Sequence, residues 1–167
     1  IPIEEFDPEF GEMIPVGREI TVEHGAIDLC YVSPRGNIAI VETKLWRNPG
    51  AHRDVVAQAI NYAGDVAKLS YDEFSDRVLQ ARARKGKRQR LEEVVRDRLK
   101  DGGFDEATFA AGIVENLAEG RFTVLIAGDR IHPNVALMAE SIQAAPHLRF
   151  SLGLLELHFY RVNKDRA

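Results

Sequence analysis

Two strand-like segments joined by a short turn constrain the fold of this chain more than any other feature of its sequence. Residues 26–33 are rich in β-forming side chains, and residues 38–41 are apolar at every position, as in a central strand. Between them, residues 34–37 read Pro-Arg-Gly-Asn, a turn sequence that predicts an antiparallel hairpin. The acid Asp28 interrupts the first segment, and Glu-Thr-Lys at 42–44 directly follows the second. The hairpin therefore carries charged side chains where burial is otherwise expected.

The rest of the chain alternates between helical and strand-like patterns. The first predicted elements are a strand over residues 12–23, the two hairpin strands and a helix from about residue 52. One or two helices follow over 72–100; the capping-box pair Ser70 and Glu73 opens them, and they are interrupted near Gly86. The last predicted elements are a helix from Asp105 to about Leu117, a strand over 122–127, a helix over 133–144 and a strand over 150–159. This order predicts an α/β fold: a three-layer domain with a mixed central sheet, helices on both faces and a helical insertion at about residues 72–118. No long linker divides the chain, so residues 1–167 are expected to form a single domain.

The charged residues of the hairpin form the candidate site. A period of two puts Glu42 and Lys44 on one face of their strand with Thr43 facing away, and strand pairing puts Asp28 roughly opposite them. Two carboxylates beside a lysine at the end of a buried strand are costly as a bare charge cluster. A hard cation such as Mg²⁺ removes that cost, because it takes carboxylate ligands together with phosphate oxygens. The cation would polarise a phosphoryl group and acidify a bound water, and the Lys44 ammonium would orient that water or stabilise developing negative charge.

These residues also carry a family resemblance. Asp28, thirteen intervening residues and Glu-Thr-Lys at 42–44 resemble the core of the PD-(D/E)xK nuclease superfamily, which has the restriction-endonuclease-like fold. Ile27 stands where that motif nominally has a proline. The resemblance implies Mg²⁺ or Mn²⁺ bound by Asp28, Glu42 and the backbone carbonyl of Thr43, with Lys44 placing or activating the attacking water. Within the superfamily, the chain resembles a bacterial branch in which Val-Glu-Thr-Lys is followed by Asn-Pro and a helix.

Two further parts of the chain bear on this resemblance. Gln58 and Tyr62 lie four apart on the predicted helix after the hairpin, so they share a face. They resemble the Gln-x-x-x-Tyr element of RecB-like branches, which implies a catalytic role in supporting the phosphate or the lysine. Many superfamily members also use a glutamate ahead of the first strand. Glu5, Glu9 and Glu12 are candidates for it, as is a residue upstream of Ile1.

A basic segment interrupts the acidic chain. The chain has a net charge of −4, yet residues 77–90 carry +7 without an acid, so the remaining residues together carry −11. Such an asymmetry favours binding of a polyanion, DNA above all, and the alternative is a solvated helix surface. No helix-turn-helix, zinc-finger or RNA-recognition signature is present, which argues for contact with the nucleic-acid backbone rather than for sequence reading. Arg77 begins this segment, and the candidate nucleic-acid-binding residues within it are Arg82, Arg84, Lys85, Lys87, Arg88 and Arg90.

Composition excludes several classes of protein. Cys30 is the sole cysteine, which excludes a disulfide framework, a cysteine zinc cluster and a four-cysteine iron–sulfur centre. No apolar stretch approaches the ~20 residues of a membrane span, so a cytoplasmic protein with no membrane partner is expected. Glycine-rich phosphate and dinucleotide loops are lacking, so no organic cofactor is expected. His24 is interpreted as a turn residue. The chain begins at Ile1 rather than Met, so upstream residues are expected to be missing.

The sequence thus predicts a metal-dependent nuclease that hydrolyses phosphodiester bonds, in DNA. One alternative is a non-catalytic module on the same fold that binds DNA or a protein, and another is an interaction domain whose acidic surface meets a basic partner. For the residues themselves, Asp28, Glu42 and Lys44 could form an ordinary salt-bridged rim, and Gln58 and Tyr62 a polar helix flank. The sequence does not distinguish exonuclease from endonuclease action. It also leaves dimerisation open, since many proteins of this fold form dimers that cut both DNA strands.

Overall fold

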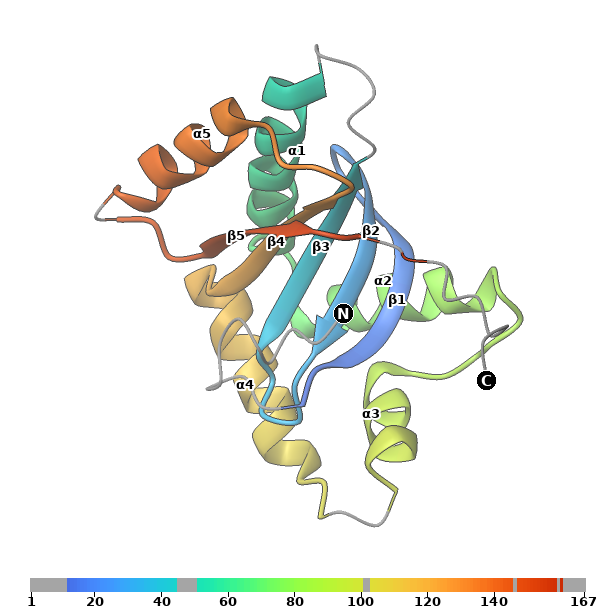
Figure 1. Cartoon of the computed structure of the whole chain (residues 1–167). Helices are drawn as coiled ribbons and strands as arrows, with labels where there is room; N and C mark the ends of the chain where they lie inside the picture. Colours follow the sequence, from blue (N-terminus) through green and yellow to red (C-terminus); the bar gives the residue numbers. More distant parts are fainter. Residues whose placement is uncertain (1–11, 45–50, 101–102, 146, 159, 161–167) are drawn as a thin grey trace, which may run out of the picture.

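The computed structural model describes residues 12–44, 51–100, 103–145, 147–158 and 160 (Figure 1). Five strands form one sheet in chain order: β1 (Ile14–Val22), β2 (Gly25–Val32), β3 (Ile38–Lys44), β4 (Phe122–Gly128) and β5 (Ser151–Glu156). The pairs β1–β2 and β2–β3 are antiparallel, whereas β3–β4 and β4–β5 are parallel. The helices are α1 (Ala51–Val66), α2 (Tyr71–Ala83), α3 (Leu91–Leu99) and α4 (Glu106–Glu119), all between β3 and β4, and α5 (Pro133–Gln143), between β4 and β5. The predicted α/β fold with a mixed sheet and a helical insertion is confirmed.

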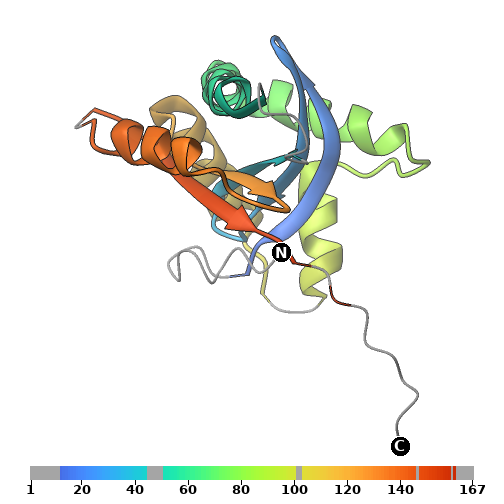
Figure 2. The same ribbon diagram turned by 45° about the horizontal axis from the view of Figure 1, so that its top comes forward.

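All five described helices pack on one face of the sheet. Their buried apolar side chains join one cluster with alternate residues of the central strands, such as Ile38 and Ile40 of β3 and Val124 of β4. Figure 2 shows α1 and α5 together on this side of the sheet, where they contact each other. The helices shield the strands from water here, which is the main stabilising contribution of such a layer.

The opposite face differs from the prediction. Its cluster is made of strand side chains and residues next to strands: Met13, Tyr31, Ala39, Val41, Leu125 and Ala127, with Leu29, Leu155 and Leu157 at its margin. No described helix contributes to it, so the expected helical layers on both faces are found on one face only. The prediction went too far because residues 38–41 are apolar on both sides, which requires two covers but does not require that both be helical.

The β2–β3 hairpin is fixed at its turn by α4. Gly36 has φ of 85°, and a Cβ there would come within 2.5 Å of the Ile113 backbone nitrogen, so only glycine fits. The buried Asn116 side chain donates from Nδ2 to the Gly36 carbonyl at 2.9 Å. From this turn the two strands pair as far as Leu29 and Val41, and Asp28 and residues 42–44 lie just beyond the last pair.

The remaining local signals behave as the sequence predicts. Ser70 caps α2, with its hydroxyl accepting from the Glu73 backbone N–H and the Glu73 carboxylate accepting in return. The Asp105 carboxylate caps α4 by accepting from the backbone N–H groups of Ala107 and Thr108, and Gly120 ends that helix in the left-handed conformation. Within the described residues, no helix is both long and apolar enough to cross a membrane.

Candidate active site

Asp28 lies just beyond the last pair of β2 with β3 and at a position that the pairs of β2 with β1 pass over. The β2–β3 register stops at Leu29, and the β1–β2 register passes from Arg18–Leu29 to Ile20–Ile27. Ile27 belongs to the helix-covered cluster but Leu29 to the opposite one, so the alternation of faces changes phase at Asp28. Across the strand gap, Glu19 of β1 has φ of 55°, an uncommon value for a residue with a Cβ.

This irregularity brings Asp28 onto Thr43. Oδ2 of Asp28 accepts hydrogen bonds from the Thr43 backbone N–H at 2.8 Å and from Thr43 Oγ1 at 2.6 Å. The aspartate thus takes the place of a ladder bond between β2 and β3, and Oδ2 is fixed by two donors. The prediction had Thr43 facing away; its backbone carbonyl stays a predicted metal ligand that no contact tests.

Glu42 is the most unusual side chain of the site. It is 6% exposed, and among the described residues its Oε2 is buried without a hydrogen-bond partner. Burial, and secondarily the nearby charge of Asp28, raises the pKa of the Glu42 carboxyl to about 7, against a smaller opposite effect of Lys44. A buried carboxyl in this state is held at a free-energy cost, which a bound cation or a proton would relieve.

Lys44 completes the predicted group at the end of β3. It is half-buried, and its charge acts on the Glu42 carboxyl. Among the described residues its ammonium forms no ion pair, so the three side chains do not form the closed salt-bridged rim that the sequence left open as an alternative. The buried carboxylate oxygen of Glu42 and the ammonium of Lys44 instead lie at the same end of β3.

Gln58 and Tyr62 of α1 are brought together, but not onto the carboxylates. Gln58 donates from Nε2 to the Tyr62 hydroxyl, and Tyr62 is 2% exposed. That hydroxyl lies against the β1–β2 turn, since a Cβ on Gly25 would come within 2.8 Å of it. No hydrogen bond of the described residues joins either side chain to Asp28 or Glu42, so their catalytic role stays a prediction.

The upstream glutamate is not found among the described residues. Glu12 precedes β1 and pairs with Arg98 of α3, with Oε1 3.5 Å from Nε. Because Ile14 pairs with Val32, this end of β1 is the end far from Asp28. Glu5 and Glu9 lie outside the described residues.

Arginines of the basic segment hold the edge strand β1. Arg77 donates to the Thr21 carbonyl at 2.7 Å, and Arg82 donates to the Val16 carbonyl at 3.2 Å. Arg84 donates to Thr21 Oγ1 at 3.2 Å. These arginines therefore satisfy acceptors of an edge strand, a role in the fold that the sequence analysis did not consider.

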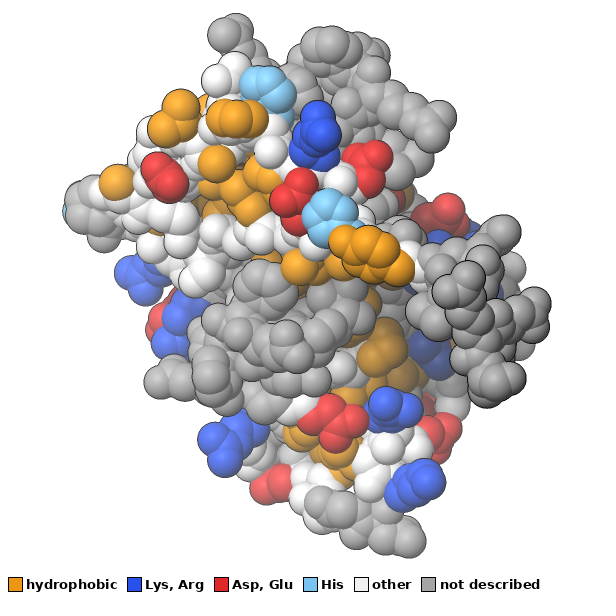
Figure 3. Space-filling view, viewed as in Figure 1, with side chains coloured by type: hydrophobic (Ala, Val, Ile, Leu, Met, Phe, Trp, Pro, Cys, Tyr) orange, Lys and Arg blue, Asp and Glu red, His pale blue; other side chains and the backbone are white. Residues whose placement is uncertain are grey.

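The rest of the segment is available to a partner. Lys85 lies 3.6 Å from the Glu19 carboxylate in an exposed ion pair, whereas Lys87, Arg88 and Arg90 are exposed and have no ion-pair partner among the described residues. On the face shown in Figure 3, basic and acidic side chains lie beside one another, so no patch of one sign spreads over that face. Of the predicted nucleic-acid-binding residues, Lys87, Arg88 and Arg90 therefore remain the best candidates, and all three lie in the loop between α2 and α3.

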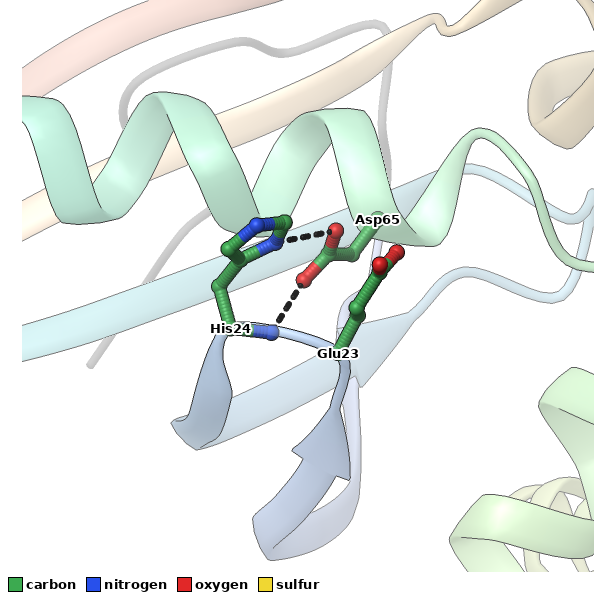
Figure 4. Close-up of side chains that lie close together, drawn as sticks. All are labelled: Glu23, His24 and Asp65. Atoms are coloured by element: carbon green, nitrogen blue, oxygen red, sulfur yellow. Dashed lines mark hydrogen bonds and ion pairs between the residues drawn. The ribbon is translucent and has the colours of Figure 1, made fainter.

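The structure adds a group that sequence reasoning missed. The buried Asp65 of α1 accepts from the His24 backbone N–H on Oδ2 and contacts His24 Nδ1 with Oδ1, both at 2.8 Å (Figure 4). Burial alone would raise the pKa of Asp65, but the two His24 contacts and the Lys68 charge lower it below its usual value. The sequence held one sign of Asp65. Its spacing of three from Tyr62, which is four from Gln58, places it on the helix face that the other two residues share.

Comparison with known proteins gives one structural neighbour. No family model matches the chain, and no curated protein matches it. The chain is similar to the crystal structure of a repair endonuclease from Pyrococcus abyssi, with 13% identity and a TM-score of 0.40, over 93% of this chain and 43% of that one. The chain thus spans less than half the length of this neighbour. At that TM-score the similarity carries no argument about activity.

Proposed function

We propose that this chain is a metal-dependent nuclease of the PD-(D/E)xK type that hydrolyses phosphodiester bonds in DNA. One observation carries the proposal: the buried Oε2 of Glu42 has no hydrogen-bond partner among the described residues, and the carboxylate lies close enough to Asp28 for the two charges to interact. A structural rim would place such a carboxylate in water or beside a donor. A site that binds a cation needs the oxygen free.

The donor set fits Mg²⁺ or Mn²⁺. Asp28 and Glu42 offer carboxylate oxygens, and the Thr43 carbonyl is the third expected ligand; all are the hard oxygen donors these cations prefer. Such a cation, when bound, polarises a phosphoryl group and lowers the pKa of a bound water.

The protein groups have separate tasks in this proposal. Thr43 fixes one oxygen of Asp28 and so holds its carboxylate in place. The Lys44 ammonium orients the attacking water or stabilises the negative charge that develops on the phosphoryl oxygens. Gln58 and Tyr62 support the phosphate or the lysine.

Cleavage assays test the proposal directly. The wild type should cut plasmid or single-stranded DNA in Mg²⁺ or Mn²⁺, and Asp28→Asn and Glu42→Gln should each lower the rate at least about 100-fold while remaining folded. Glu140→Gln, an exposed carboxylate on α5, is the matched control and should cut at the wild-type rate. Calorimetry should show Mg²⁺ binding that both site variants lose.

Two results would count against the proposal in different ways. Metal binding lost in both variants, without cleavage of any DNA by the wild type, would favour a non-catalytic module on the same fold. Equal metal binding by the wild type and both variants would remove the site itself.

The DNA surface has its own test. Phosphate contacts make binding fall with salt, with a logarithmic slope of about 0.9 per contact. Arg88→Gln and Lys87→Gln should each reduce this slope by about that amount without changing stability. Arg35→Gln, at the β2–β3 turn far from the α2–α3 loop, is the control and should leave the slope unchanged. An unchanged slope in the Lys87 and Arg88 variants would move the DNA surface elsewhere.

A further inference from the structure

A second group of metal-ligand side chains lies where the β1–β2 turn meets α1. Glu23, His24 and Asp65 each offer one ligand atom, and these atoms lie within 4.8 Å of one another (Figure 4). Two ligands bound to one cation at about 2.1 Å each are separated by about 3–4 Å, so small side-chain movements would close the group around an ion.

The residues of this group differ in how firmly they are held. Asp65 is 3% exposed, and its Oδ2 is fixed by the His24 backbone N–H, while its Oδ1 faces the imidazole. His24 is 51% exposed and Glu23 is exposed, so an ion can approach from solvent. A buried ligand fixed by a backbone donor, with two ligands open to solvent, is a suitable frame for a metal centre.

The ammonium group of Lys68 lies beside the two carboxylates. Nζ of Lys68, two residues beyond α1, is 3.2 Å from Glu23 Oε2 and 3.7 Å from Asp65 Oδ1. This ammonium compensates one of two negative charges, and its flexible, exposed side chain can leave the group. The local field therefore attracts positive charge, and Lys68 is the group that an ion must displace.

We propose that Glu23, His24 and Asp65 bind a divalent transition metal such as Zn²⁺, in competition with the ammonium of Lys68. One imidazole nitrogen and two carboxylate oxygens suit Zn²⁺ or Co²⁺ better than Mg²⁺, which prefers oxygen ligands alone. The ion would join the β1–β2 turn to α1. Since Asp28 lies a few residues along β2 from this turn, the ion would stiffen the strand that carries the candidate active site.

The experiment uses a protein without the nuclease site. In the Asp28→Asn, Glu42→Gln double variant, Co²⁺ is titrated and followed by its visible absorption, with Zn²⁺ as competitor. We expect one Co²⁺ per chain, displaced by Zn²⁺ and not by Mg²⁺. This result is independent of the proposed nuclease activity, because the double variant lacks both carboxylates of that site.

Substitutions in the same background assign the ligands. Glu23→Gln and His24→Gln should weaken binding at least tenfold, and His24→Gln keeps the backbone N–H that anchors the turn to Asp65. Lys68→Met should tighten binding several-fold, a gain that a role in folding alone does not explain. His147→Gln, an exposed histidine elsewhere, is the control and should bind like the background.

Two outcomes would overturn the inference. One is the absence of Co²⁺ binding both in the double variant and in its Lys68→Met derivative. The other is binding of the same affinity in the Glu23→Gln and His24→Gln derivatives, which would locate the ion elsewhere on the chain.

Discussion

Replacing Glu42 by glutamine should stabilise the metal-free protein at alkaline pH. The carboxyl is buried, and burial together with the Asp28 charge raises its pKa from 4.5 to about 7. In the unfolded chain the group ionises near 4.5, so between these values the folded state holds a proton that the unfolded state releases. Stability therefore falls as pH rises through this window and stays lower above about 7. Glutamine cannot ionise and removes this loss.

The size of the gain follows from the shift. Each pKa unit corresponds to about 1.4 kcal/mol, so the full effect is about 3 kcal/mol at pH 8. Partial hydration near the end of β3 brings the expected gain to about 2 kcal/mol. Near pH 5 the two proteins should differ by less than about 1 kcal/mol, because little of the window has then been crossed.

Urea denaturation in EDTA at pH 5 and pH 8 measures both quantities. Glu140→Gln, on an exposed face of α5, is the matched control and should differ from the wild type by less than about 0.5 kcal/mol at either pH. The reasoning fails if Glu42→Gln is no more stable than the wild type at pH 8. It also fails if the gain is as large at pH 5, since the stabilisation would then be unrelated to ionisation.

Three further substitutions test contacts that hold the hairpins and α2 in place. Asp65→Asn should lower the unfolding free energy by about 1–3 kcal/mol in urea titrations, because one of the two His24 contacts loses its charged acceptor; full stability would mean that the turn is anchored in another way. Gly36→Ala should cost at least about 2 kcal/mol, since its Cβ would meet the Ile113 backbone at a positive φ, and wild-type stability would contradict the tight turn. Ser70→Ala should lower stability by about 1 kcal/mol in thermal melts through loss of the α2 cap, and no change would show that the cap is dispensable.

Local sequence signals predicted the elements well because their causes are local. The turn at 34–37, the capping box at Ser70 and Glu73, and the helical stripe from residue 52 each depend on neighbours a few residues away. Each produced the expected element within a few residues, and the order of elements produced the mixed sheet.

Contacts between distant parts of the chain were not predictable in this way. Arg82 reaches the Val16 carbonyl across 66 positions, and His24 meets Asp65 across 41. A run of arginines has the same composition whether it binds phosphate or the free carbonyls of an edge strand. Composition therefore favoured DNA over a solvated surface and gave no sign of the contacts with β1. The prediction of helices on both faces was wrong for a similar reason. An apolar strand indicates that both of its faces are buried, but it does not indicate which kind of element covers each face.

The candidate site is where several energetic costs coincide. Glu19 has a positive φ, which costs about 1 kcal/mol or more in a residue with a Cβ. Beside it, the pairs between β1 and β2 pass over Asp28, and the pairs between β2 and β3 end at Leu29. On β3, Glu42 is buried with an oxygen that has no hydrogen-bond partner among the described residues. All three features lie at or beside Asp28 and Glu42. The proposed cation site accounts for these costs together, and the gain expected for Glu42→Gln measures what presenting the two carboxylates costs the fold.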